Sequence, residues 1–208
     1  MRILGFLGSP HVNGRSSKLL KKALEGAASK GAEIKEFDLY KMNIKYCTGC
    51  GACYLTKPEL KIGKCSLKDD APAIFEEYVE AEGYIYASPV YDMFITALMK
   101  TFLERKIMLT YRPKEAVAKI PDSRCCAYFK KKASIIVTGN CTDEYREVMG
   151  DPCFEAYEGH HMIEQIDTVD KMYCGSHETI TEEDFNKKLD EAFQMGVKIV
   201  EEIEKARL

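Results

Sequence analysis

Short apolar runs alternate with segments of helical periodicity along this chain. Runs typical of buried strands fall at residues 2–8, 33–39, 83–88 and 133–139, with one more strand within 162–174. Apolar positions at helical spacing, or helix capping signals, mark residues 16–30, 69–81, 95–109, 143–157 and 181–206. Strands that alternate with helices predict one doubly wound α/β domain over residues 1–208, with a five-stranded parallel sheet in the order 2-1-3-4-5 and helices on both faces.

Two stretches break this alternation. Residues 47–65 carry four cysteines and form a predicted cysteine loop after the second strand. Residues 110–131 contain two prolines and no clear period, which is typical of an extended arm or lid. We expect this arm to form part of a contact between subunits.

Composition narrows the class of partner. Hydrophobic residues make up 46% and charged residues 30% of the chain, which suits a folded globular protein. A net charge of -3 gives no basic footprint for nucleic acid. No apolar run is long enough to cross a bilayer and no export signal is present, so we expect a cytoplasmic protein with no membrane partner. Nine cysteines then favour metal binding or redox chemistry over disulfides.

The turn after the first strand reads GSPHVNGRSS and leads directly into a helix. Unpaired amides at a helix N-terminus favour an anion, and the hydroxyls of Ser9, Ser16 and Ser17 add further donors. The turn has no G-x-G-x-x-G, and it is one residue too long for a Walker loop. A phosphate monoester is therefore the predicted ligand. The alternative is a glycine-rich turn in which Ser16 simply caps the helix.

The third strand is followed by the turn Ser88-Pro89-Val90-Tyr91, on the same rim of a doubly wound sheet as the first turn. Proline fixes the backbone and tyrosine offers a flat apolar surface, a combination that suits a planar heterocycle. A receiver domain shares this topology, but it needs acidic residues at these strand ends, and the chain has Gly8-Ser9 and Ser88-Pro89 there.

Both turns are similar to known motifs. GSPHVNGRSSKLL resembles the phosphate loop, and SPVYDMFITALMKTFLER the SPVY segment, of flavodoxin-like FMN reductases and the related iron-sulfur flavoproteins, over about residues 1–105. The resemblance implies FMN, a flavodoxin-like fold and a homodimer or homotetramer. It places the phosphate near Ser9, His11, Gly14, Ser16 and Ser17, and the isoalloxazine ring near Pro89, Val90, Tyr91, Thr138, Gly139 and Asn140. The chain departs from the family pattern at His11, usually arginine, and at Arg15, usually asparagine.

Cys47, Cys50 and Cys53 follow one another at a spacing that suits three corners of a [4Fe-4S] cluster. Gly49 and Gly51 between them can adopt unusual backbone angles. The context of Cys65, GKCSLKDD, resembles the segment with the last ligand in iron-sulfur flavoproteins, although LTKPELKIG before it looks like an insertion. Thiols without metal and a zinc site are the alternatives. His160-His161 is expected in a solvated loop, and Lys130–Lys132 is expected to face water.

The resemblance implies a flavin-dependent oxidoreductase that transfers electrons between a ferredoxin-like carrier and an acceptor through FMN and the cluster. The cysteine loop follows strand two, the neighbour of strand one, so the cluster is expected near the flavin crevice. No catalytic acid or base is expected. The first alternative is a cluster-free reductase that passes electrons from NAD(P)H through FMN to a quinone, free flavin or other acceptor. The second is a zinc-stabilised domain that only binds a partner.

Overall fold

The computed structural model describes residues 1–111, 122–125, 127–128, 130–176 and 178–207. Its central sheet contains five parallel strands in the predicted order, with the second strand at one edge and the last at the other. These strands are β2 (Glu33–Asp38), β1 (Arg2–Leu7), β3 (Gly83–Tyr91), β7 (Lys132–Thr138) and β8 (Asp167–Cys174). A sixth strand, absent from the prediction, is the short β4 (Phe94–Ile95), which pairs antiparallel with β3.

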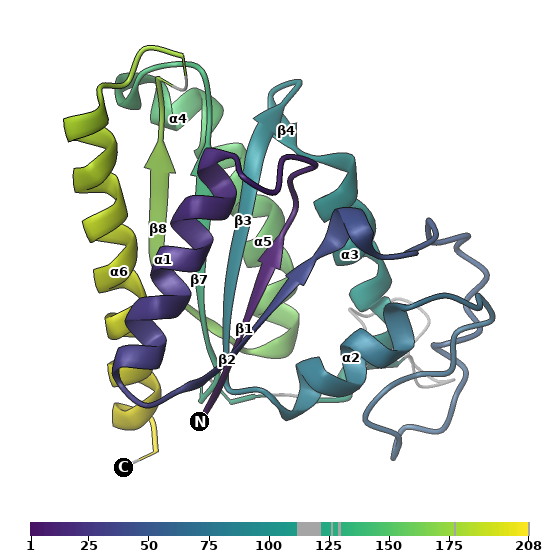
Figure 1. Ribbon diagram of the computed structural model, residues 1–208. Coiled ribbons are helices and arrows are strands. Elements are labelled where there is room, and N and C mark those ends of the chain that lie inside the picture. The colour runs from purple at the N-terminus through teal and green to yellow at the C-terminus, as the bar shows by residue number, and fades with distance from the viewer. Residues whose placement is uncertain (112–121, 126, 129, 177, 208) are drawn as a thin grey trace.

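Helices cover both faces of the sheet, as Figure 1 shows. One face packs against α1 (Arg15–Ser29) and α6 (Glu182–Lys205). The other packs against α2 (Ala71–Glu80), α3 (Ala97–Arg105) and α5 (Asp151–Glu164). The one-turn helix α4 (Arg146–Met149) precedes α5, and 3-10 turns occupy Leu39–Lys41, Lys106–Leu109 and Asp143–Tyr145.

The alternation of side chains along β1 explains the two cores. Ile3 and Leu7 point to the layer of α1 and α6, whereas Leu4 and Phe6 point to the layer of α2, α3 and α5. All four are completely buried, as in a parallel strand covered on both faces. The continuous apolar run at the start of the chain is thus the sequence signal of a central strand.

Three sequence predictions need correction. The third strand continues through Pro89 to Tyr91, because these residues pair with β7 and β4. The polar helix is broken into two pieces and extends to Glu164, so His161 lies on α5 and is only 2% exposed. Lys132 is buried and its ammonium is paired with Asp167 at 2.6 Å, so the lysine run does not simply face water.

The predicted arm begins and returns as a small two-stranded sheet. β5 (Thr110–Tyr111) pairs antiparallel with β6 (Asp122–Ser123). Residues 112–121, 126 and 129 of this arm lie outside the described residues. Within the described part of the chain, every helix is too short or too polar to span a bilayer.

Candidate functional site

The carboxyl ends of β1, β3 and β7 bring three loops to one end of the sheet (Figure 1). These loops enclose a pocket of about 740 Å³. Its walls come from the turn after β1, the end of β3, the end of β7 and one residue before α6. They are Ser9, Pro10, His11, Val12, Asn13, Gly14, Arg15, Ser16, Pro89, Tyr91, Thr138, Asn140 and Glu178. Ligands of doubly wound sheets bind at this kind of crevice.

The first helix begins inside this pocket without a side-chain cap. Gly14 is the N-cap residue, and within the described part of the chain no side-chain hydrogen bond caps the helix. The amide of Gly14 itself donates to the carbonyl of His11 at 2.9 Å, which closes the turn. Gly14, and not Ser16, is therefore the helix cap. Uncapped amides with no acidic residue in the first turn make a site for an anion.

Hydroxyl groups tie the three loops together. Ser16 Oγ and Thr138 Oγ1 are 2.7 Å apart, and both residues are buried. Thr96, just before α3, donates from its hydroxyl to the carbonyl of Gly8 at 2.6 Å, and its amide donates to Ser88 Oγ at 3.3 Å. Thr96 was not among the residues predicted from the sequence. Its signal was a threonine placed to cap the helix, which it does by accepting from the amide of Met99 at 3.2 Å.

The other end of the crevice is less polar. A second pocket of about 370 Å³ shares Pro89, Tyr91, Thr138 and Asn140 with the first and adds Val90, Asp92, Met93, Gly139 and Met149. The β3–β4 hairpin turns through Asp92 and Met93, both with positive φ, as a two-residue turn of type I′ requires. Its strand residue Tyr91 stays 45% exposed, and the turn residue Met93 is 50% exposed. A flat ligand can contact these side chains.

Ten of the eleven predicted cofactor residues line these two adjoining pockets. Ser17 does not: its side chain is buried in α1 with an unpartnered hydroxyl. Sequence reasoning did not assign Asn13, Arg15 or Glu178 to the site, although Arg15 was noted as a departure. Glu178 is more than thirty residues from every predicted site residue, so no local pattern could reveal it. The donors at one end and the apolar surface at the other fit a phosphate and a planar ring, the two parts of FMN.

The four predicted metal ligands line a separate cavity of about 50 Å³. Its walls include Cys47, Cys50, Cys53 and Cys65, together with Arg105. Gly49 and Gly51 have φ values of 66° and 72°, so the turn between the first three cysteines uses the backbone freedom predicted for it. The cysteine loop therefore gathers all four thiols around one space.

Polar groups surround these thiols. The hydroxyl of Ser66 contacts the exposed Cys50 sulfur at 3.3 Å and, with nearby amides and Thr48, lowers the pKa of Cys50 to about 7. Burial raises the pKa of Cys53, and the neighbouring Cys65 adds to this shift. Cys65 Sγ accepts from Arg105 Nη2 at 3.3 Å. Thiolates are the form that binds metals, so the lowered pKa of Cys50 favours ligation.

An ion pair with Asp69 holds the side chain of Arg105 in place. Its guanidinium forms a two-nitrogen ion pair with Asp69, and both side chains are almost completely inaccessible. Burial alone would raise the pKa of Asp69, but the hydrogen bonds from Arg105 and the attraction of its charge hold that pKa below the usual value. Arg105 thus presents a fixed positive charge to the sulfur of Cys65, and an anionic cluster would benefit from it.

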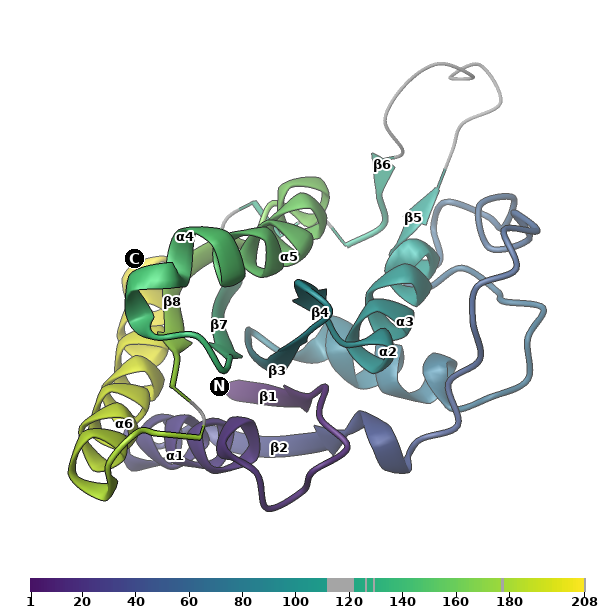
Figure 2. The same ribbon diagram turned by 90° about the horizontal axis from the view of Figure 1, so that it is seen from above.

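The described residues contain no group of three or more His, Cys, Asp or Glu placed around a single metal ion. Zinc needs four ligands at about 2.0–2.3 Å from one centre, whereas a cubane cluster accepts four thiolates around a larger core. The four cysteines line one cavity, but they are not arranged as the ligands of a single ion. This cavity shares no lining residue with the crevice pockets, and Figure 2 shows the cysteine loop at the side of the domain, beyond α3. Within one chain the two sites are separate.

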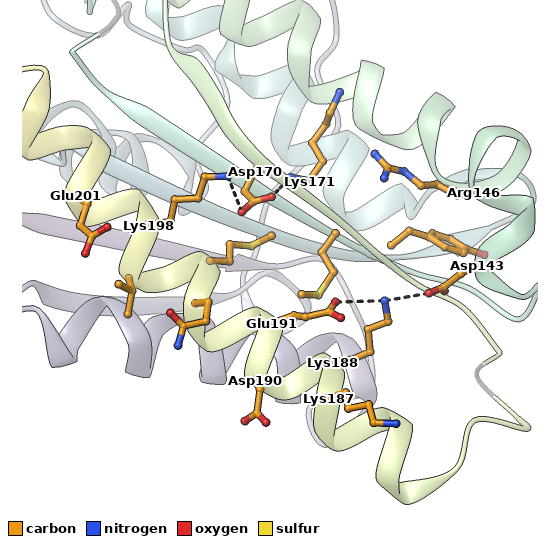
Figure 3. A pocket seen from close by; sticks show the side chains of 15 residues that line it. Asp143, Arg146, Asp170, Lys171, Lys187, Lys188, Asp190, Glu191, Lys198 and Glu201 are labelled. Carbon is orange, nitrogen blue, oxygen red and sulfur yellow. Dashed lines mark hydrogen bonds and ion pairs between the residues drawn. The ribbon is translucent and has the colours of Figure 1, made fainter.

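A larger groove lies between β8, α4 and α6, with a volume of about 1080 Å³ (Figure 3). Its charges compensate one another. Lys198 pairs with Asp170 at 3.1 Å, and Lys188 bridges Asp143 at 2.9 Å and Glu191 at 3.3 Å. These pairs cover the outer strand of the sheet, which is a usual protection of an edge strand. Although this groove is larger than the crevice pockets, we do not take it as the candidate site, because several of its charged side chains are already paired with one another.

Comparison with known proteins identifies the family of this chain. A family model described as NADPH-dependent FMN reductase matches residues 1–120. An iron-sulfur flavoprotein of Archaeoglobus fulgidus is 38% identical over 113 residues, which cover 54% of this chain and 49% of that protein. An iron-sulfur flavoprotein of Methanocaldococcus jannaschii is 34% identical over 105 residues, or 50% of this chain and 51% of that protein. The chain thus spans about half the length of the curated relatives it matches.

Solved structures show the same fold. An NAD(P)H:quinone oxidoreductase from Methanothermobacter marburgensis superposes with a TM-score of 0.69 at 14% identity, over 96% of this chain and 98% of that one. A flavone reductase superposes with a TM-score of 0.68 at 21% identity, over 98% of this chain and 63% of that one. Such low identities support the fold alone. With the family model matching more than half of its residues, the chain belongs to the NADPH-dependent FMN reductase family.

Proposed function

We propose that this chain is a flavin-dependent oxidoreductase that binds FMN in the crevice at the ends of β1, β3 and β7. The observation that carries the proposal is the uncapped start of α1, which faces the same crevice as the apolar β3–β4 hairpin. A phosphate at one end and a planar ring at the other match these two surfaces. The family match supports the same ligand.

Each part of the crevice has a role in this proposal. The amides of the first turn of α1, with the hydroxyls of Ser9 and Ser16, hold the phosphate, and His11 and Arg15 lie beside it. The backbone from Pro89 to Tyr91 and from Thr138 to Asn140 positions the ring. FMN supplies the redox chemistry, since flavins exchange two electrons as hydride or single electrons in turn. The protein orients the ring and limits the access of water to it.

We also propose a [4Fe-4S] cluster on Cys47, Cys50, Cys53 and Cys65, with a ferredoxin-like carrier as the electron-transfer partner. The four thiols line one cavity, and Arg105 provides a positive charge beside it. The printed names of the relatives, iron-sulfur flavoproteins, support this choice. Such a cluster exchanges single electrons, so the cysteine loop is the proposed point of contact with the carrier.

A cluster-free reductase that takes electrons from NAD(P)H is the second candidate. Two observations favour it: the family description names NADPH, and the cysteine cavity is separate from the crevice within one chain. In either case we propose a cytoplasmic homodimer or homotetramer.

An absorption spectrum of the protein purified without oxygen, with assays of flavin, iron and sulfide, distinguishes the cluster-containing protein from the cluster-free reductase. The proposal predicts about one FMN and about four irons per chain. If the protein contains FMN but no iron, and NADPH bleaches the flavin, the cluster proposal is wrong and the chain is an NAD(P)H-dependent reductase. A colourless protein that does not take up FMN would contradict both.

A further inference from the structure

Arg124, which follows β6 in the returning part of the arm, makes an unusual number of hydrogen bonds. All three nitrogens of its guanidinium donate, and five of the acceptors are backbone carbonyls. The carbonyls belong to Thr110 at 2.9 Å from Nε, to Lys57 at 2.6 Å and Leu60 at 3.1 Å from Nη1, and to Cys53 at 3.0 Å and Thr56 at 2.9 Å from Nη2. Four of these five residues lie in the segment between Cys53 and Cys65.

The segment that Arg124 contacts, between Cys53 and Cys65, contains the insertion seen in the sequence. The chain folds back on itself here, because Gly63 packs against the carbonyl of Cys53. A Cβ atom at Gly63 would lie 2.4 Å from that oxygen, so only glycine allows the approach. The hydroxyl of Thr56 also donates to the Cys53 carbonyl, at 2.7 Å. The extra residues therefore form a closed bulge whose two ends meet.

Closing this bulge brings Cys65 back to the other three thiols. The entropic cost of holding the two ends of a loop together grows with its length, and without ties the ends would separate. Arg124 adds several ties to the one that Thr56 makes within the loop, because its planar group offers five N–H donors in fixed directions. A lysine at this position offers one nitrogen and cannot reach all five carbonyls.

Arg124 is itself well anchored. Its amide donates to the carbonyl of Leu109 at 2.7 Å, and the adjacent Ser123 pairs with Thr110 across the β5–β6 ladder. The next residue, Cys125, donates from its thiol to the carbonyl of Lys61 at 3.1 Å. Two consecutive residues at the base of the arm, Arg124 and Cys125, thus form hydrogen bonds with the bulge.

We infer that Arg124 is a positioning residue for the cysteine site: it clamps the bulge between Cys53 and Cys65 and so keeps Cys65 within reach of the other three thiols. The inference rests on the proposed function only in naming a cluster as the ligand of those thiols. It also gives the base of the arm a role within its own chain, in addition to the subunit contact expected from the sequence.

The first test uses protein without a cluster. Arg124→Ala and Arg124→Lys are compared with wild type and with Arg146→Ala, which removes an exposed arginine on α4. Alkylation of individual cysteines is followed by mass spectrometry, and hydrogen exchange is followed in peptides over residues 53–65. Both Arg124 variants should alkylate at Cys53 at least about tenfold faster, while the buried Cys153 and Cys174 keep their rates. Unchanged alkylation and exchange would overturn the inference.

The second test asks for the cluster. After anaerobic reconstitution, Arg124→Ala should bind fewer irons than wild type, with a changed visible spectrum, and should bind as much FMN. Deleting residues 55–62 removes the bulge, and in that background Arg124→Ala should no longer affect iron content. An equal loss of iron in both backgrounds would mean a general effect on the fold and would contradict positioning. If wild type binds no iron, the cluster proposal fails, and the alkylation rates still decide whether Arg124 clamps the loop.

Discussion

The hydroxyls of Ser16 and Thr138 lie 2.7 Å apart and join the first turn of α1 to the end of β7. The two residues are 122 positions apart in the chain, and each is almost completely buried. Because both also line the crevice, this hydrogen bond fixes the distance between its phosphate end and the end of β7, which leads into Gly139 and Asn140. The shape of the proposed FMN site therefore depends in part on this buried contact between α1 and β7.

Thr138→Val should destabilise the protein by about 1–3 kcal/mol, because the buried hydroxyl of Ser16 then has no partner. Valine keeps the shape of threonine, so the loss measures the hydrogen bond rather than a cavity. Thr138→Ser keeps the hydroxyl and should lose clearly less. Urea unfolding of the three proteins without FMN makes the comparison, and equal stability of the valine variant and wild type would mean that the contact does not form.

Arg15→Glu should weaken FMN binding by about tenfold or more, because it reverses a charge at the start of α1, beside the proposed phosphate. An acidic residue in the first turn is otherwise favourable for a helix, so the loss of affinity should not reflect a weaker helix. Arg15→Gln is the matched control for the lost contact with the ring of Phe185, which lies 4.7 Å from the guanidinium. Fluorescence titration with FMN gives the affinities. Equal affinities of the Glu and Gln variants would place the phosphate elsewhere.

Asp69→Asn should cost about 3–5 kcal/mol, since it leaves the buried Arg105 without its carboxylate. The exposed pair of Lys100 and Glu104, at 2.7 Å, provides the control, and Glu104→Gln should cost less than about 1 kcal/mol. Chemical denaturation measures both. A loss for Asp69→Asn as small as that of the control would show that the Arg105 charge is solvated. The environment proposed for Cys65 would then be wrong.

The stability of the protein should fall as the pH drops below about 6.5. Burial and the nearby Lys106 hold the pKa of His161 well below its usual value, so folded protein keeps this imidazole neutral. The unfolded chain binds a proton there first, and this favours unfolding by about 1.4 kcal/mol per pH unit below the unfolded pKa. His161→Gln should reduce that slope, measured by denaturation at pH 7, 6 and 5. An unchanged slope would mean that His161 is protonated in the folded state.

The parallel sheet could be predicted from the sequence because its strands are apolar on both faces, as at Ile3, Leu4, Phe6 and Leu7. The crevice followed from topology, since parallel strands end on one rim. Helix and strand ends were less accurate. Pro89 suggested the end of a strand, but the pairing of β3 with β7 and β4 carries the strand on to Tyr91.

The contacts of the cysteine loop could not be predicted, because they join distant segments. Nothing near Cys65 in the sequence indicates that Arg105 donates to its sulfur from 40 residues away, or that Arg124 grips the carbonyl of Cys53 from 71 residues away. The histidine pair was misread for a related reason: its surroundings are polar in sequence, but Thr168 and Tyr86 bury His161 in space. Local pattern gives no information about such partners.

Calorimetric titration of the protein with FMN and with riboflavin, which differ only in the phosphate, measures how much the phosphate contributes to flavin binding. We expect about one FMN per chain and at least about a hundredfold weaker binding of riboflavin, because riboflavin leaves the amides at the start of α1 without an anion. Equal affinities for the two flavins, or no binding of either, would contradict the proposed FMN site.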